Sequence, residues 1–431
     1  MQSTIGVANK THRLSTGINV NIKHSFVSVA GVVLSQALNF VSILLIGKYC
    51  GPTELGYFSQ LMAAGLFTGT IIGLRLEVAC LAANKTLAVR AMTSSSVVAI
   101  VIGLALVVTT TVAAHAEYIP VIGLAFGVFL QQALCAALTS ERKYTKIATI
   151  RFFPNAVFFI CFFCLMAFSK GECTGFGIFN LYSWIFLASN FCLASIYLYS
   201  ARRMIPVTVV KFSALQIQYA KYGVPTTALN SFVIYASAIL IPLIFDHRDA
   251  GIFALAYRVG YFPASLLSQS LGAIFRRDLV DYFDVERQGG VNPSKQFFTM
   301  LTLISLALVA ACYAGLSLLI HLKMGDEWEP SMSVYVLFIP YFITMAMYSS
   351  MAQVFIVVNR QKIDLVIQTA SAVTIFMSLA LAHFFGLKFF YTLLLISVGG
   401  TIVASAGTCA ALKIGKGSGA YRTRQPGLET Q

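Results

Sequence analysis

Two charged residues, Arg75 and Glu77, interrupt an apolar stretch that is long enough to cross a membrane. This stretch runs from Gly56 to Ala83. A membrane-spanning helix needs about 20 mostly apolar residues, and ionisable groups inside one are costly and usually face a cavity or a partner. An arginine in this setting suits an anionic cargo, and a carboxylate suits a proton or a sodium ion. The rest of the chain is therefore expected to position a polar, cationic path through a membrane.

The composition of the chain is that of a membrane protein rather than of a soluble domain. Its 431 residues are 58% hydrophobic and only 11% charged, and its mean hydropathy is +0.79. A soluble domain of this length carries far more polar surface. We therefore predict an all-α polytopic membrane protein.

Twelve apolar runs bounded by charged or turn residues are candidate membrane spans, and every connection between them is too short for a soluble domain. The first six lie near 25–49, 57–83, 94–114, 117–138, 149–168 and 177–199, and the second six near 223–245, 252–275, 297–320, 332–357, 365–385 and 388–412. The predicted organisation is a cytoplasmic N-terminal segment (1–24), a six-helix lobe (25–200), a cytoplasmic linker (201–222), a second six-helix lobe (223–412) and a cytoplasmic tail (413–431).

The distribution of basic residues predicts which loops face the cytoplasm. If the N-terminus is cytoplasmic and the sides alternate, 23 of the 30 lysines and arginines lie in cytoplasmic loops and only five in outer loops. The remaining two are Arg75 and Arg258, inside spans. Membrane proteins carry this excess on the cytoplasmic side. Both termini are therefore predicted to be cytoplasmic, and topology explains the net charge of +14 better than nucleic-acid binding does.

A short internal repeat relates the two sets of spans. The string Glu54-Leu-Gly-Tyr-Phe58 resembles Asp249-Ala-Gly-Ile-Phe253 at an offset of 195 residues. Likewise, Ala37-Leu-Asn39 resembles Ala228-Leu-Asn230 at an offset of 191 residues. Two six-helix halves in the same orientation are predicted, and such parallel repeats place a transport site at their interface, around a central cavity.

Arg75 and Arg258 are the two cations predicted inside spans. If Gly56 and Gly251 mark the outer ends of their helices, a rise of about 1.5 Å per residue places Arg258 roughly 10 Å and Arg75 roughly 28 Å from the outer surface. An anionic cargo that crosses between the halves can then pass from one arginine to the other. The alternative is that each arginine extends to its nearer headgroup layer.

Glu77 is the one carboxylate inside a predicted span. It follows Arg75 by two residues, about 200° around a helix, so the two are not expected to pair on one helix face. Glu77 is the candidate ion-coupling residue, for a proton or a sodium ion. The alternative is a structural pair with an arginine on another helix.

Amide and hydroxyl side chains recur at helical spacing in the first helix of each half. Facing lipid they would be costly, so they are expected to face inward. Such groups suit a sugar-bearing cargo, and hydrogen bonds between helices explain any single one equally well. The predicted substrate-binding residues are Arg75, Arg258, Gln36, Asn39, Gln132, Asn230, Tyr235 and Tyr257.

Neither an enzyme, a metal site nor a cofactor is predicted. The sequence has no Ser-His-Asp set, phosphate-binding loop or metal motif, and its six histidines are scattered. Most of the nine cysteines lie inside apolar runs, so a disulfide framework is not expected.

Several strings resemble those of Wzx-type oligosaccharide flippases, within the multidrug/oligosaccharidyl-lipid/polysaccharide exporter superfamily. In the first half they are GPTELGYF at 51–58 and GLRLEVA at 73–79, followed by Asn84-Lys85. In the second half they are YGVP at 222–225, AGIFALAYRV at 250–259, SLGAIF at 270–275, GDEWE at 325–329, Ile339-Pro340 and NRQ at 359–361. The order and spacing of the strings carry the resemblance, from about residue 25 to residue 370. SLGA lacks a polar residue that the family leads us to expect, and the tail after Lys413 matches nothing.

The resemblance implies twelve helices in two lobes around a cationic cavity. It implies alternating access that moves an undecaprenyl-pyrophosphate-linked glycan to the outer leaflet of a bacterial inner membrane, for assembly of O-antigen in lipopolysaccharide, or of a capsule or exopolysaccharide. Arg75, Glu77 and Arg258 match charged positions of the family strings. The chain is expected to act as a monomer, with a polysaccharide polymerase and chain-length proteins as partners.

Two other functions are weighed against the flippase. A cation-coupled small-molecule antiporter of the same superfamily would need more membrane-embedded carboxylates than Glu77. A membrane glycan polymerase or ligase normally has a large outer loop with basic catalytic residues, whereas the outer loops here are short and net negative.

Overall fold

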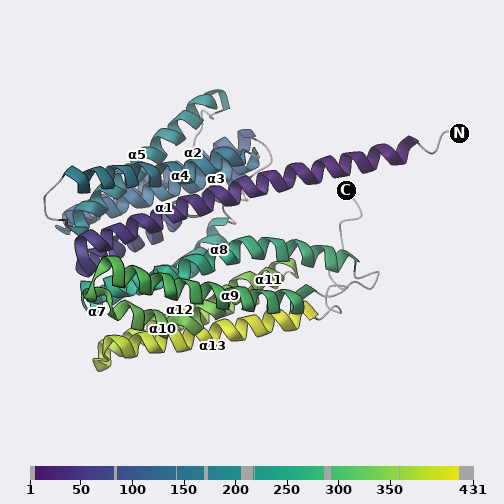
Figure 1. Cartoon of the computed structure of the whole chain (residues 1–431). Helices are drawn as coiled ribbons and strands as arrows, with labels where there is room; N and C mark the ends of the chain where they lie inside the picture. The colour runs from purple at the N-terminus through teal and green to yellow at the C-terminus, as the bar shows by residue number, and fades with distance from the viewer. Residues whose placement is uncertain are drawn as a thin grey trace. The chain divides into compact units, whose positions relative to one another are not determined.

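The computed structural model describes residues 5–81, 85–141, 143–168, 173–204, 217, 219–285, 293–358 and 360–416. Regular structure in these ranges is entirely helical, which confirms the predicted all-α class. The long helices in Figure 1 are α1 (Ile5–Ile71), α2 (Lys85–Val112), α3 (Ile119–Ser140), α4 (Tyr144–Phe168), α5 (Gly175–Ser200), α7 (Val224–Ile244), α8 (His247–Val285), α9 (Pro293–Leu319), α10 (Pro330–Met351), α12 (Gln361–Phe385) and α13 (Phe389–Lys416), with a short α11 (Gln353–Val357).

Helix α1 contains two of the predicted spans in one run. Its backbone breaks at Gly51, where φ is 81° and ψ is 175°, and Pro52 follows directly. Glycine reaches this positive φ because it has no Cβ, and proline suits the start of the next helix because it needs no N–H partner there. Eleven helices among the described residues are long and apolar enough to cross a membrane when α1 is counted once. The predicted architecture of about twelve spans agrees with this count.

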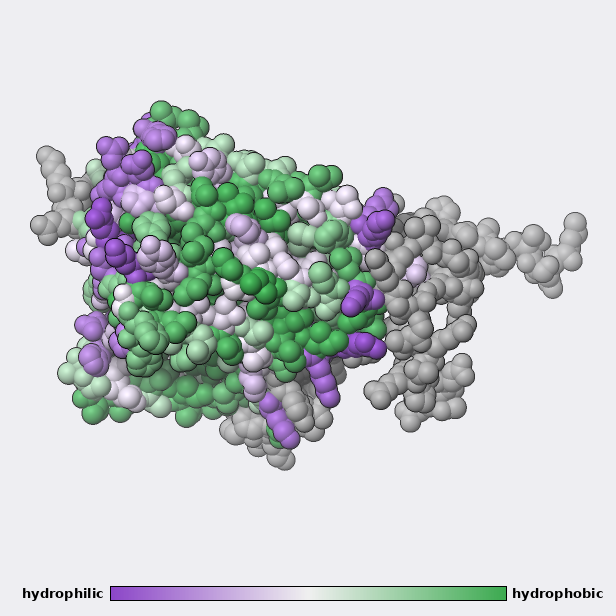
Figure 2. Space-filling model, turned by 90° about the horizontal axis from the view of Figure 1, so that it is seen from below, coloured by the Kyte–Doolittle hydropathy of each residue, from purple (hydrophilic) through white to green (hydrophobic). Residues whose placement is uncertain are grey.

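The exposed side chains of these helices are largely apolar. On the face shown in Figure 2, hydrophobic residues form a broad band, and hydrophilic residues gather at its left edge and near its right end. Large apolar side chains such as Val101, Ile160 and Phe384 are exposed. Soluble proteins rarely expose a continuous apolar surface of this extent. The protein is therefore a multi-pass membrane protein.

The chain divides into two compact units. Unit 1 comprises Met1–Leu45 and Ala64–Ala228, and unit 2 comprises Ile46–Ala63 and Leu229–Gln431. The segment Ile46–Ala63, which the sequence analysis assigns to the first lobe, clusters with unit 2. The other predicted lobe boundaries stay a prediction.

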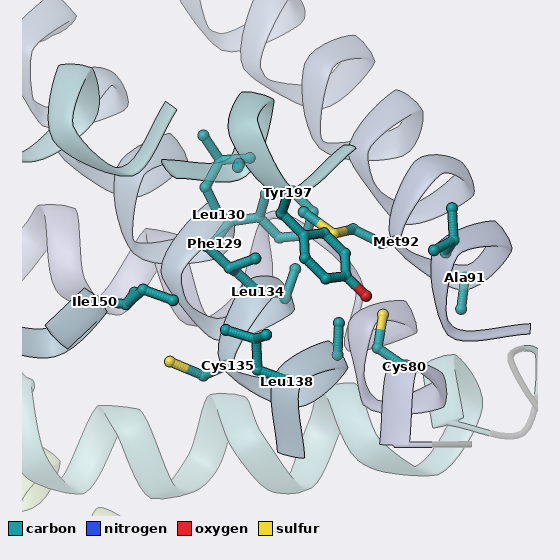
Figure 3. Close-up of a cluster of buried hydrophobic side chains, with 14 of the residues drawn as sticks. Cys80, Ala91, Met92, Phe129, Leu130, Leu134, Cys135, Leu138, Ile150 and Tyr197 are labelled. Atoms are coloured by element: carbon teal, nitrogen blue, oxygen red, sulfur yellow. The ribbon is translucent and has the colours of Figure 1, made fainter. Parts of the chain in front are cut away.

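Helix α3 is the centre of unit 1, where it packs against α2, α4 and α5. Its side chains Phe129 and Leu134 lie in one buried cluster with Met92 of α2, Tyr197 of α5 and Cys80. Figure 3 shows this cluster, with the Tyr197 hydroxyl pointing toward Cys80. Because lipid is as apolar as these side chains, close packing rather than exclusion of water holds the helices together.

Aromatic rings fill the contact between α8 and α10 in unit 2. The ring of Tyr257 stacks between those of Phe253 and Tyr261, with centroid distances of 5.1 and 5.2 Å. Phe338 and Phe342 of α10 approach the same ring at 6.0 and 5.8 Å. Aromatic pairs at these distances contribute about 0.5–1.5 kcal/mol each beyond their buried area. These five rings, which we call the aromatic ladder, therefore fix the position of α8, which carries Arg258.

Two glycines related by the internal repeat meet at a helix crossing inside unit 2. A Cβ on Gly56 would lie 1.8 Å from the carbonyl oxygen of His247, and a Cβ on Gly251 would lie 1.8 Å from that of Pro52. His247 follows Pro52 by the same offset of 195 residues that separates the two glycines. The contact is therefore reciprocal, which supports the repeat inferred from the sequence. The two backbones lie so close that neither position accommodates a side chain.

Glu141, directly after α3, connects three elements of unit 1 through its carboxylate. Its Oε1 accepts a hydrogen bond from Tyr197 of α5 at 3.0 Å and lies 3.5 Å from Nζ of Lys85, while its Oε2 accepts a hydrogen bond from Lys143. Burial alone would raise the pKa of Glu141. The hydrogen bonds from Lys143 and Tyr197 and the charges of the two lysines outweigh burial, so this pKa lies below its ordinary value.

Unit 1 is expected to lose stability in acid as Glu141 becomes protonated. A carboxyl with a lower pKa in the folded chain stabilises the fold above its unfolded pKa, which is about 4.3 for an ordinary glutamate, and this contribution disappears as the pH falls through the lower folded pKa. Glu141→Gln should therefore lower the melting temperature near neutral pH and reduce its further fall in acid. Thermal unfolding of the detergent-solubilised protein measures both values. An equal acid-induced fall in wild type and variant would contradict this role of Glu141.

Candidate functional site

The chain leaves the helical conformation before it reaches the two charges of the predicted second span. Helix α1 ends at Ile71, and Leu74 and Arg75 have positive φ values of 49° and 56°. A 3-10 helix, η1, follows from Leu76 to Leu81. This left-handed conformation costs a residue with a Cβ about 1–2 kcal/mol, so the surroundings must hold it in place. The predicted continuous helix over 57–83 is therefore wrong at this end, and helical rise does not give the depth of Arg75.

The unwound backbone brings Arg75 and Glu77 together. Nη1 of Arg75 donates a hydrogen bond to Oε1 of Glu77 at 3.2 Å and another to Oε1 of Gln132, on α3, at 3.5 Å. The prediction that Arg75 and Glu77 cannot pair is wrong, because the left-handed backbone replaces the helical step on which it depends. Three predicted site residues thus form one cluster, Arg75–Glu77–Gln132.

The carboxylate of this cluster is buried, whereas its cation is partly accessible. Glu77 is 3% exposed, and the side chain of Arg75 is 29% exposed. Oε2 of Glu77 is buried and has no hydrogen-bond partner among the described residues. A buried charge without a partner is strongly destabilising, so the guanidinium is the group that compensates this carboxylate. The result is a partly accessible cation, Arg75, that is held by a buried anion, Glu77.

Gly73 lets α3 pack closely against the cluster, and Gly223 lies in contact with it. A Cβ on Gly73 would lie 2.4 Å from the ring of Phe129 and 2.9 Å from Oε2 of Glu77. A Cβ on Gly223 would lie 3.6 Å from Cβ of Arg75. Gly223 ends η4 (Tyr219–Gly223), a π-helical turn that leads into α7. The cluster is therefore in contact with α3 and with the start of the second predicted half.

Arg258 lies on α8 in unit 2 and is half-buried. Its Nη2 lies 3.6 Å from Sδ of Met62, and its neighbour Tyr257 belongs to the aromatic ladder. Arg75 and Arg258 belong to different units. That both arginines bind the same anionic cargo along one path therefore stays a prediction.

The polar residues of the two first helices differ in their surroundings. Gln36, Asn39 and Tyr235 are half-buried, and Asn230 is exposed. Oε1 of Gln36 is buried and has no hydrogen-bond partner in the described part of the chain. Their role in binding a cargo stays a prediction.

One of the hydroxyl side chains at helical spacing in α1, that of Ser35, connects helices instead of facing a cargo. Ser35 donates a hydrogen bond to the carbonyl oxygen of Arg151 at 2.7 Å and accepts one from Nδ2 of Asn155 at 3.0 Å. These contacts join α1 to α4 inside unit 1. These are hydrogen bonds between helices, the alternative to cargo binding for the polar residues of this helix.

Comparison with known proteins identifies the fold. No family model matches the sequence, and no curated protein matches it. The inward-facing conformation of a multidrug resistance MATE family transporter of the MOP superfamily matches with a TM-score of 0.65 at 14% identity, over 88% of this chain and 94% of that chain. The outward-facing conformation of such a transporter matches with a TM-score of 0.61 at 12% identity, over 92% and 96%. The chain has the MATE transporter fold.

The eukaryotic MATE transporter AtDTX14 is also similar, with a TM-score of 0.53 at 14% identity over 93% of this chain and 98% of that chain. The MATE fold confirms the predicted all-α architecture with two lobes. None of these three structures is described as a Wzx-type flippase, and the narrower resemblance stays an expectation.

The half-buried carboxylate of Asp364 in this MATE fold is not identified from the sequence. Asp364, in the first turn of α12, accepts hydrogen bonds from the hydroxyl of Tyr348 and from Nε2 of Gln368. The predicted span begins one residue later, at 365, so Asp364 counts there as a loop residue. Boundaries read from a sequence shift by one or two residues. The polar pair four residues apart, Asp364 and Gln368, is the signal that would have placed it on a helix face.

The described part of this MATE fold holds no group of three or more His, Cys, Asp or Glu side chains placed to bind a metal ion. The free cysteines are Cys80, Cys135, Cys161, Cys164, Cys192, Cys312 and Cys409. Cys50 and Cys173 are disulfide-bonded, whereas the sequence leads us to expect no disulfide framework.

Proposed function

We propose that the chain is a membrane transporter that works by alternating access and moves an undecaprenyl-pyrophosphate-linked oligosaccharide from the cytoplasmic to the periplasmic leaflet. The observation that carries this proposal is the partly exposed guanidinium of Arg75, held by Glu77 and Gln132 within an apolar unit. Arginine is a strong partner for a diphosphate because its planar fork binds two oxygens at once. The translocated oligosaccharide units would then be used for the assembly of O-antigen, capsule or exopolysaccharide.

The mode of transport is inferred from the MATE fold. Transporters with this fold are known in inward-facing and outward-facing conformations. For this chain, the same alternation would move the diphosphate and its sugars across while the polyprenyl tail stays in the bilayer. The sequence resemblance to Wzx-type flippases, rather than the fold, supports the lipid-linked glycan as cargo.

We assign the protein to a bacterial inner membrane, with both termini cytoplasmic. The excess of basic residues in one set of loops supports this orientation. Cys50 and Cys173 lie at loops predicted on the outer side, and disulfides persist in oxidising compartments such as the periplasm. The transporter would act as a monomer, with a polysaccharide polymerase and chain-length proteins as partners in the envelope.

A cation-coupled small-molecule antiporter is the second candidate function. The similar solved structures include multidrug resistance transporters, so the fold comparison favours this candidate more directly than it favours the flippase. Glu77, which is buried, would then bind the coupling ion, and Asp364 adds a half-buried carboxylate. Against this candidate, Glu77 is already paired with Arg75, and a cationic drug would meet the repulsion of that arginine.

Genetic complementation separates the two candidates. In a strain that lacks the gene, we would express wild type, the charge-neutral variant Arg75→Gln/Glu77→Gln, and the exposed control Arg90→Ala. Surface polysaccharide, lipid-linked units on each leaflet and drug sensitivity are scored at matched protein levels. The flippase predicts that units accumulate on the inner leaflet in the deletion strain and with the double variant, and that wild type and Arg90→Ala restore the surface glycan.

Two outcomes would reject the flippase. Normal surface glycan with increased drug sensitivity in the deletion strain would establish the antiporter instead. Accumulation of units on the outer leaflet would indicate a defect in polymerisation, which is the third function weighed from the sequence.

A further inference from the structure

In the Arg75–Glu77–Gln132 cluster, one nitrogen of the partly accessible Arg75 donates hydrogen bonds both to the buried carboxylate of Glu77 and to Gln132. Nη1 of Arg75 lies 3.2 Å from Oε1 of Glu77 and 3.5 Å from Oε1 of Gln132. The accessible part of the cluster belongs to the guanidinium, since Glu77 is 3% exposed. An anion that reaches the cluster therefore meets Arg75 and competes with Glu77 for it.

This competition has an electrostatic consequence for Glu77. When an anionic cargo draws the guanidinium away, the carboxylate is left in a buried position without its compensating charge. Leaving one partner of a buried ion pair without its counter-charge is strongly destabilising, and a carboxyl in this position takes up a proton instead. The other oxygen of Glu77, Oε2, is buried without a hydrogen-bond partner among the described residues.

We infer that Arg75 exchanges partners, from the Glu77 carboxylate to a diphosphate of the cargo, and that Glu77 takes up a proton from water in the same step. Arg75 stays protonated throughout, and Gln132 accepts its hydrogen bond in both states. Binding of one diphosphate and binding of one proton are therefore coupled at a single site. This inference deepens the proposed function, and it rests on that function for the identity of the anion.

The other ionisable groups around Glu77 do not replace it as the proton acceptor. Segment η1 packs against α2, α3 and η4. On η1 the neighbouring group is the thiol of Cys80, and the hydroxyl of Tyr197 lies beyond it; both are neutral near pH 7 by their ordinary pKa values. The charged groups on the packed elements are Lys85, which pairs with Glu141, and the exposed side chains of Arg90 and Lys221.

Arg75, the residue that changes partners, lies on an unwound backbone beside the turn that leads into α7. Leu74 and Arg75 occupy a conformation that costs energy and that their contacts must hold. Gly223, at the end of η4, lies against Arg75. The turn that leads into α7 therefore lies beside the base of the Arg75 side chain.

Isothermal titration calorimetry of the purified full-length protein tests the exchange without a transport assay. The probe is P1,P2-dimethyl pyrophosphate, a diester whose two charges do not titrate near neutral pH. Titrations at one pH in buffers with different ionisation enthalpies give the number of protons taken up per ligand bound. For wild type we expect about one proton per ligand, because binding and protonation are linked. Glu77→Gln should take up none and should bind about tenfold more tightly, since no carboxylate competes for Arg75.

The remaining variants make the result decisive. Arg75→Gln/Glu77→Gln should lose the binding, and the exposed control Arg90→Gln should behave as wild type. Binding by wild type without proton uptake would overturn the exchange and leave Arg75 as an anion site. Loss of binding in Glu77→Gln would also overturn it, because Glu77 would then only position Arg75. Absence of binding by wild type would overturn the exchange, whereas the leaflet assay of lipid-linked units decides the proposed function independently.

Discussion

Replacing Gly251 by alanine is expected to lower the melting temperature of the protein sharply. The new Cβ would lie 1.8 Å from the carbonyl oxygen of Pro52, far inside van der Waals contact, and the obstacle is backbone rather than a movable side chain. Overpacking a well-packed site costs about 1–3 kcal/mol, and a clash with backbone lies at or beyond the upper end of this range. Gly56→Ala should have the same effect, because its Cβ would meet the carbonyl oxygen of His247 at the same distance.

Gly315→Ala is the matched control for this prediction. Gly315 lies in the interior of α9, as Gly251 lies within α8, but a Cβ there meets nothing within 4 Å. Alanine at this position should stabilise the helix by about 0.5–1 kcal/mol, since glycine in a helix interior is unfavourable. Thermal unfolding in detergent compares the three variants with wild type. Similar melting temperatures for Gly251→Ala and Gly315→Ala would show that the two backbones are not in contact.

Arg75→Gln is expected to be the most damaging single substitution in unit 1. It leaves the buried carboxylate of Glu77 without its cation, and breaking a buried pair in this way costs about 3–5 kcal/mol. The reverse change, Glu77→Gln, should cost only about 1 kcal/mol, since the arginine left behind is partly exposed and keeps its hydrogen bond to Gln132. The double variant should recover most of the stability lost in Arg75→Gln, because no buried charge remains.

A double-mutant cycle built from thermal unfolding measures this recovery. Arg90→Gln removes an exposed arginine from α2 and should change the stability by no more than about 0.5 kcal/mol. Stability and function should separate in the double variant, which is expected to fold like wild type and to fail in complementation. If Arg75→Gln were as mild as Arg90→Gln, Glu77 would not depend on Arg75 for its charge.

Much of the fold is predictable from the sequence because membrane helices have a strong and simple signal. Apolar length sets the spans, and the offset of 195 residues between Gly56 and Gly251 identifies a repeat whose two copies meet in the structure. The assignment of Ile46–Ala63 to unit 2 is not predictable in this way. It depends on which helices pack together, and hydropathy carries no information about that.

Hydropathy and helical spacing do not predict the geometry of the candidate site. Arg75, Glu77 and Gln132 are each identifiable as polar groups in apolar surroundings, but their mutual contact depends on two residues with positive φ. Neither Leu74 nor Arg75 is a residue type that favours this conformation, so no local rule predicts it. Asp364 was missed for a simpler reason, since the predicted helix begins one residue after it.

The reciprocal contact of Gly56 and Gly251 also bears on the origin of the chain. A two-fold symmetric dimer has an interface in which residue i of one copy contacts residue j of the other, and j contacts i. The contacts of Pro52 with Gly251 and of His247 with Gly56 have this form within one polypeptide. An ancestor with six helices would have made them by pairing with a second copy of itself. After duplication and fusion of its gene, each glycine remains constrained by the backbone of the other helix, so neither can be replaced, whatever residue stands at the other position.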